Sequence, residues 1–127
     1  MKLWMAIAVG GAIGSLARYG MSGIIQQSNS SAFPWGTLLV NLTGSFLMGC
    51  LWHWMEYNGA STALKGLILV GGLGAFTTFS TYSLEVLTLS RMHDLRLALT
   101  YVLSSNVLCV LGAVAGYLCL RPFLPTS

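Results

Sequence analysis

Four long apolar runs follow one another along this chain, with short connections between them. The runs cover residues 3–25, 35–55, 66–90 and 97–120. A membrane-spanning helix needs about 20 predominantly apolar residues, so each run is long enough to cross a bilayer. The connections are too short for a soluble domain. The sequence therefore predicts an all-α membrane protein, in which residues 1–127 form a single domain of four transmembrane helices.

The composition excludes several other classes of protein. Only 7% of the 127 residues are charged, whereas soluble domains carry about 25% charged residues. The six basic side chains are too few and too scattered for a nucleic-acid surface. Cys50, Cys109 and Cys119 lie inside apolar runs and lack the spacing of zinc ligands. No nucleophile–base pair, metal cluster or phosphate-binding loop indicates an enzyme.

The basic residues show almost no preference for one side of the membrane. With four spans, Lys2, Lys65 and Arg121 lie on the side of both termini, and Arg91 and Arg96 lie opposite, joined by Arg18 if it sits near the far end of the first span. An excess of Lys and Arg on one side normally orients a membrane protein. A chain without that excess can insert in both orientations.

Four single helices enclose little interior, which favours self-association. Small residues recur at helical spacing, as in Gly10 and Gly14, Ser45 and Gly49, and Gly112 and Gly116. This pattern lets membrane helices approach closely, either within one subunit or between two. The sequence leaves both arrangements open.

Polar residues form a stripe along the second and fourth spans. Thr37, Asn41 and Ser45 recur every four residues, as do Tyr101 and Ser105, so each set shares one helix face. A polar stripe in hydrocarbon must face protein or water. Asn41 can make a structural hydrogen bond between helices or contact an ion, and the hydroxyls of the fourth span suit an anion that accepts hydrogen bonds.

The third span has an unusual middle, residues 71–83. Three glycines precede six hydroxyl-bearing residues in seven positions, which is a poor composition for a continuous helix. We expect a break around Gly74 and Thr77. The carbonyl groups that a break frees can coordinate a small cation, and the N-terminus of the following half-helix suits an anion. The alternative is a glycine-rich packing face with hydroxyls bonded to their own backbone.

Two charged residues lie inside the predicted spans. Arg18 either attracts anions to the mouth of a pathway or extends its side chain to the interface. Glu85 follows the hydroxyl block and is expected to have a structural role, because no second carboxylate accompanies it.

Three segments resemble the Fluc fluoride channels, also called the CrcB family. They are GGAIGSLARY at 10–19, PWGTLLVN at 34–41 and TTFSTYSLE at 77–85. The resemblance covers nearly the whole chain. It implies an antiparallel homodimer of dual topology, with two pores that carry fluoride passively out of the cell. It also implies a multi-pass location in the cytoplasmic (inner) membrane of a prokaryote, in contact with lipid.

The resemblance implies a role for several individual residues. Asn41 would line a pore, and Phe79 would be the first of two aromatic rings facing the ion. The second ring, usually phenylalanine in the family, is Tyr82 here. The backbone carbonyls of Gly74 and Thr77 would hold one structural Na⁺ on the two-fold axis. The remaining predicted pore residues are Arg18 near the vestibule and a polar track of Ser80, Thr81, Tyr101 and Ser105.

Two other functions fit a small membrane protein. A proton-coupled multidrug exporter of dual topology needs a carboxylate in the first span, and residues 3–25 contain none. An assembly subunit without transport activity would not require adjacent blocks of glycine and hydroxyl residues. The sequence favours the channel over both.

Overall fold

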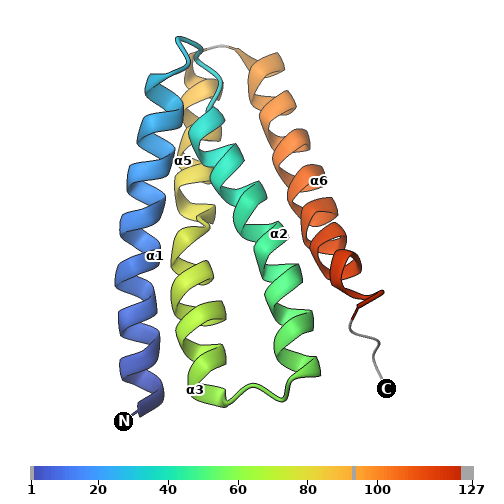
Figure 1. The fold of residues 1–127 in the computed structure, drawn as a ribbon. Coiled ribbons are helices and arrows are strands. Elements are labelled where there is room, and N and C mark those ends of the chain that lie inside the picture. The colour runs from blue at the N-terminus through green and yellow to red at the C-terminus, as the bar shows by residue number, and fades with distance from the viewer. Residues whose placement is uncertain (1, 93, 124–127) are drawn as a thin grey trace.

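The chain is a bundle of helices in the computed structural model, which describes residues 2–92 and 94–123 (Figure 1). No strand occurs in these residues. The predicted all-α class is confirmed, and each apolar run is helical within a few residues of its expected bounds. In chain order the helices are α1 (Lys2–Gln27), α2 (Trp35–Tyr57), α3 (Thr62–Lys65), the π-helical segment η1 (Gly66–Leu73), α4 (Gly74–Phe76), α5 (Phe79–Arg91) and α6 (Leu95–Leu120).

Three helical segments in the described part of the chain are long and apolar enough to cross a membrane. They are Trp35–Tyr57, Thr62–Arg91 and Leu95–Leu120. The chain is therefore a multi-pass membrane protein. Helix α1 is as long as α6, at 26 residues, but it is not among the three.

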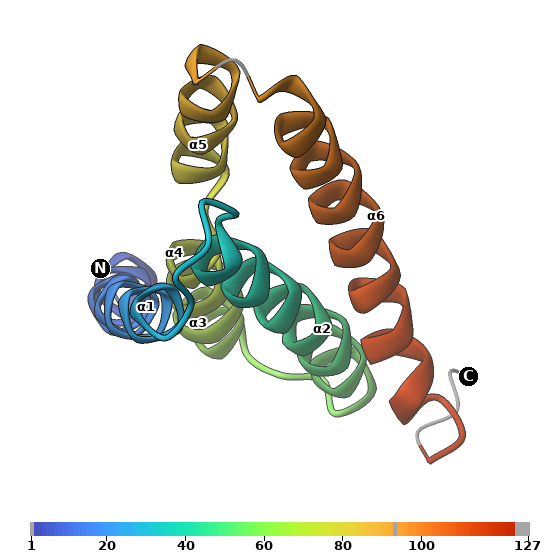
Figure 2. The same ribbon diagram turned by 90° about the horizontal axis from the view of Figure 1, so that it is seen from above.

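The helices form two closely packed pairs. α1 packs along η1 and α4, and α6 packs along α2. Seen from above, α1 lies beside the segment from α3 to α4, whereas α6 lies on the far side of α2 (Figure 2). Helix α5 leans away from α1 and contacts α6. This arrangement leaves space between α2, α5 and α6 for polar side chains.

Glycines bring the paired helices into backbone contact. A Cβ at Gly10 would collide with the Leu67 carbonyl oxygen of η1, and a Cβ at Gly14 with that of Gly72. In the other pair, a Cβ at Gly116 would collide with the Phe46 carbonyl oxygen. The small residues of these spans therefore serve packing within one chain, which was one of the two arrangements that the sequence left open.

The third span is broken, but the glycines do not make the break. Gly71 and Gly72 remain helical, and a Cβ at Gly71 would lie 3.0 Å from the Gly10 Cα. Extended backbone appears only at Thr77 (φ −79°, ψ 153°) and Thr78 (φ −146°, ψ 119°). The predicted broken helix is confirmed. The expectation that the glycines belong to the break is corrected, because they let α1 approach instead.

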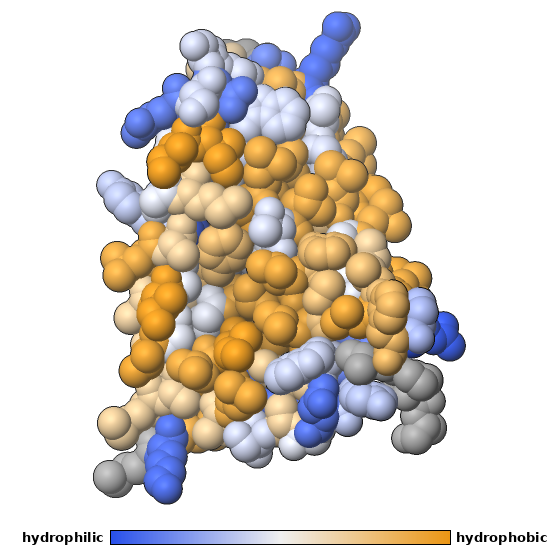
Figure 3. Space-filling view, viewed as in Figure 1, coloured by the Kyte–Doolittle hydropathy of each residue, from blue (hydrophilic) through white to orange (hydrophobic). Residues whose placement is uncertain are grey.

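The surface of the bundle is apolar over its middle. Figure 3 shows a broad hydrophobic area, with hydrophilic side chains mainly at the two ends. Ile13 and Leu16 of α1 and Leu103 and Val110 of α6 are each more than 60% exposed in the single chain. A soluble monomer rarely exposes so large an apolar area. Such a surface requires lipid or protein around it.

Candidate functional site

Asn41 closes the break in the third span. In an uninterrupted helix the Thr78 N–H would donate to the Gly74 carbonyl oxygen. It donates instead to Asn41 Oδ1 at 2.7 Å, and Asn41 Nδ2 donates to the Thr78 carbonyl oxygen at 3.0 Å. The side-chain amide thus pairs with one residue of extended backbone, as a neighbouring strand would. Asn41 makes the interhelical hydrogen bond that the sequence left as one alternative.

The hydroxyl residues after the break begin the next helix. Thr78 is the N-cap of α5, and its Oγ1 accepts a hydrogen bond from the Thr81 N–H at 3.2 Å. The same Oγ1 lies 3.1 Å from Thr81 Oγ1 and 3.2 Å from Ser80 Oγ. A cap of this kind satisfies one of the N–H groups that every helix start leaves free. The local hydroxyls therefore stabilise the α5 N-terminus, whose dipole favours negative charge.

The break frees backbone carbonyls on its other side. The usual donor to Gly74 O is the Thr78 N–H, and the usual donor to Thr77 O is the Thr81 N–H. Both N–H groups donate to side chains instead. Arg18 Nε donates to the Ala75 carbonyl oxygen at 3.1 Å, so its cation lies at the negative end of the preceding helix. The two carbonyls predicted to hold Na⁺ thus lose their helical donors.

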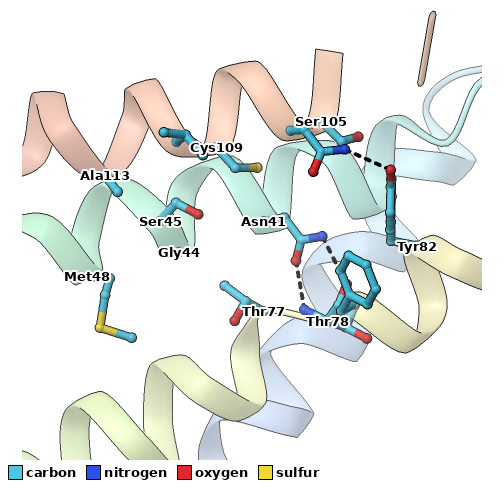
Figure 4. A pocket seen from close by; sticks show the side chains of 13 residues that line it. Asn41, Gly44, Ser45, Met48, Thr77, Thr78, Tyr82, Ser105, Cys109 and Ala113 are labelled. Carbon is cyan, nitrogen blue, oxygen red and sulfur yellow. Dashed lines mark hydrogen bonds between the residues drawn. The ribbon is translucent and has the colours of Figure 1, made fainter. Parts of the chain in front are cut away.

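A groove of about 330 Å³ opens beside the break (Figure 4). Its walls are the polar faces of α2 and α6 and the first turn of α5. The lining residues are Asn41, Gly44, Ser45, Met48, Thr77, Thr78, Phe79, Tyr82, Ser105, Asn106, Cys109, Val110 and Ala113. None of these side chains carries a formal charge, so the groove presents hydrogen-bonding groups and ring edges.

The groove brings together four of the predicted pore residues: Asn41, Phe79, Tyr82 and Ser105. The other four do not line it. Ser80 and Thr81 lie at the start of α5, Arg18 contacts the break from α1, and Tyr101 is fully buried. Their predicted pore roles stay predictions.

Aromatic rings run from the groove into the core. Phe79 is 75% exposed in the single chain, and Tyr82 is 8% exposed. Their ring centroids are 5.2 Å apart with an interplanar angle of 44°. Tyr82 in turn lies 5.3 Å from Tyr101. Phe79 is therefore the ring that is free to meet an ion, while Tyr82 is held by its neighbours.

Glu85 ties three helices together behind the groove. Thr37 Oγ1 of α2 donates to Glu85 Oε1 at 2.7 Å, and the Tyr101 hydroxyl of α6 donates to Glu85 Oε2 at 2.7 Å. The structural role expected for this carboxylate agrees with these contacts. The sequence did not identify its partners, although both lie on the predicted polar stripes.

Replacement of Glu85 by alanine is expected to destabilise the fold by about 2–4 kcal/mol, because two hydroxyls lose a charged acceptor in a largely apolar environment. Thr88→Ala is the matched control, since the Thr88 hydroxyl only bonds the Leu84 carbonyl of its own helix. Denaturant unfolding of both variants in detergent measures the difference. Equal stability of the two variants would contradict the importance of the three-helix contact.

Asn106 and Thr78 were missed as groove residues. Asn106 Nδ2 donates to the Tyr82 hydroxyl oxygen at 2.9 Å and to the Val102 carbonyl oxygen at 2.8 Å. The available signal for Asn106 was an amide next to Ser105 in a membrane span. The signal for Thr78 was its position at the start of a helix-forming segment, which is typical of an N-cap.

Comparison with known proteins finds one family along nearly the whole chain. The sequence model described as "CrcB-like protein, Camphor Resistance (CrcB)" matches residues 5–117. The fluoride-specific ion channel FluC of Magnetococcus marinus is 54% identical over 111 residues, which are 87% of this chain and 90% of that protein. The proteins of the same name from Hahella chejuensis (43% over 111 residues, 87% of both chains) and Thermus thermophilus (40% over 117 residues, 92% and 94%) are also similar.

Proposed function

The chain belongs to the CrcB family, and from this membership we propose that it is a fluoride channel. The observation that carries the proposal is the uncharged polar groove at the break of the third span, formed by residues of a chain that matches fluoride-specific channels over most of its length. The protein is a transporter of ions and not an enzyme. The multidrug exporter receives no support, because the relatives are named as fluoride channels and α1 contains no carboxylate.

The chemistry of the groove fits a small, strongly hydrated anion. A pore for fluoride must replace the water shell with closely placed donors and then release the ion again. The hydroxyl and amide groups of Asn41 and Ser105 and the ring edge of Phe79 provide such contacts. A fixed positive charge would bind the anion too tightly. The proposed mechanism is passive movement of fluoride down its electrochemical gradient, out of a prokaryotic cell across its inner membrane.

The proposed conducting unit is an antiparallel homodimer with two pores, in which α1 is the fourth span. Three observations support it. The basic residues show almost no bias between the two sides. The single chain exposes a large apolar surface, and Phe79 is mostly uncovered. A second copy would cover part of that surface and complete the wall of the groove, and lipid would cover the rest.

We also propose a structural Na⁺ at the break, held by the carbonyl oxygens of Gly74 and Thr77. Support comes from the two displaced donors, because the Thr78 and Thr81 N–H groups bond side chains and leave these carbonyls available. Hard cations take oxygen ligands, and carbonyls at membrane depth need a partner. In the proposed dimer, two copies would supply both pairs of carbonyls.

The direct test is fluoride release from liposomes. Purified protein reconstituted into vesicles loaded with potassium fluoride is expected to release fluoride to an electrode when valinomycin carries the counter-charge. Vesicles loaded with potassium chloride should release far less chloride, and vesicles without protein should release neither ion. Absence of fluoride release from folded, dimeric protein would refute the proposed function.

Removal of Na⁺ is expected to reduce fluoride release without unfolding the helices, because the freed carbonyls lose the cation that holds them. The measurement compares vesicles prepared in Na⁺ with vesicles prepared in N-methylglucamine, with the rate restored by added Na⁺. Release that is the same after exhaustive Na⁺ removal would contradict the cation site but would leave the fluoride pathway intact.

A further inference from the structure

The hydroxyl group of Tyr82 is held in place at the groove. Its oxygen accepts a hydrogen bond from Asn106 Nδ2 at 2.9 Å. The Asn106 amide is itself fixed, because the same nitrogen donates to the Val102 carbonyl oxygen at 2.8 Å. The Tyr82 ring packs between Phe79 and Tyr101. Both the ring and the hydroxyl therefore have little freedom to move.

The hydrogen of this hydroxyl is available. The Tyr82 oxygen acts as an acceptor toward Asn106, and its O–H donates to no group within residues 2–92 and 94–123. A hydroxyl that accepts a hydrogen bond becomes a stronger donor, because the two bonds polarise each other. Tyr82 lines the groove, so the free hydrogen belongs to a group at its wall.

A second hydroxyl in the same groove also has no acceptor. Ser105 is 6% exposed and lines the groove from α6. Its Oγ lies near the Tyr101 hydroxyl but makes no hydrogen bond among the described residues. Figure 4 shows Ser105 and the Tyr82 hydroxyl at the same end of the groove. Buried hydroxyls without partners are rare, and one that faces a groove indicates a ligand.

We propose that the hydroxyls of Tyr82 and Ser105 form an anion site in which fluoride accepts a hydrogen bond from each, and that Asn106 is a positioning residue that keeps the Tyr82 O–H a donor. The inference rests on the proposed function. Hydroxyl donors suit fluoride, the small halide that accepts hydrogen bonds most strongly. The nearest carboxylate, Glu85, is occupied by Thr37 and Tyr101, so it does not compete for the Tyr82 hydrogen.

The test separates binding from maximal throughput. Initial fluoride release is measured over a range of fluoride concentrations for the wild type, Tyr82→Phe, Asn106→Leu and the double variant. Tyr82→Phe should raise the half-saturating concentration about tenfold, as expected for a lost hydrogen bond to an ion, with the maximal rate unchanged or higher. Asn106→Leu should raise it about threefold through a less well-placed hydroxyl. Tyr57→Phe is the matched control, because Tyr57 is exposed at the end of α2.

The double variant distinguishes positioning from a merely structural role. If Asn106 acts through Tyr82, Asn106→Leu adds nothing to the half-saturating concentration once the hydroxyl is gone. Wild-type half-saturation in Tyr82→Phe, or a full effect of Asn106→Leu in the Tyr82→Phe background, overturns the inference alone. Absence of fluoride release from the wild type overturns the proposed function and this site together. If Tyr82→Phe does not fold, Ser105→Ala serves instead, with an expected rise of about threefold.

Discussion

Replacement of Phe79 by isoleucine is expected to reduce fluoride release about 100-fold, which corresponds to about 2.7 kcal/mol in the barrier. The ring stands at the mouth of the groove, in the first turn of α5, and it is 75% exposed in the single chain. The edge of an aromatic ring carries partial positive charge, which an aliphatic side chain lacks. Isoleucine keeps the apolar volume but removes the contact that partly replaces the water of the ion.

The control for this change is Phe123→Ile. Phe123 is 77% exposed and lies just after α6, away from the groove. Fluoride electrode recordings from vesicles should show normal release for Phe123→Ile and almost none for Phe79→Ile. Size-exclusion chromatography and circular dichroism should give the same profile for both variants. Wild-type release from Phe79→Ile would remove this ring from the ion pathway.

Replacement of Gly116 by leucine is expected to destabilise the folded chain by about 3 kcal/mol or more, because side chains forced into a packed contact move the backbone. The α2–α6 pair meets at this point. A Cβ at Gly116 would collide with the Phe46 carbonyl oxygen and lie 3.1 Å from the Cys50 nitrogen. Since these are backbone atoms, a change of side-chain rotamer does not relieve the collision. The helices have to separate, which disrupts the groove between them.

The control for Gly116 is the same substitution at Gly20. No heavy atom lies within 4 Å of a Cβ built at Gly20, and leucine favours a helix over glycine by about 1 kcal/mol. Gly20→Leu should therefore be as stable as the wild type or more stable. Denaturant unfolding in detergent and the yield of monodisperse protein measure both variants. Equal yields and unfolding midpoints would contradict the close α2–α6 contact.

Much of the fold could be predicted from local composition. The lengths of the apolar runs predicted the helices, since a bilayer sets the number of residues that a span needs. The glycine and hydroxyl residues of the third span predicted the broken helix, because they stabilise a continuous membrane helix poorly. Within that segment the two blocks have separate roles. Gly71 and Gly72 let α1 approach, whereas Thr77 and Thr78 form the break.

The partners of the polar residues could not be predicted in the same way. The four-residue spacing placed Thr37 and Asn41 on one face of α2, but it did not show what that face meets. Asn41 bonds the backbone of a residue 37 positions away, and Thr37 bonds Glu85, 48 positions away. Contacts over such separations depend on how the helices pack, which no local pattern contains.

For this protein the sequence by itself determined the membrane helices, the family, and the polar segment that interrupts the third span. These properties depend on neighbouring residues and on the solvent that surrounds each segment. The tertiary structure alone decided that Asn41 closes the break, that Glu85 joins α2, α5 and α6, and that Asn106 directs the Tyr82 hydroxyl. The physical reason is that buried polar groups must find partners, and the available partners are known only when the packed helices bring distant side chains together.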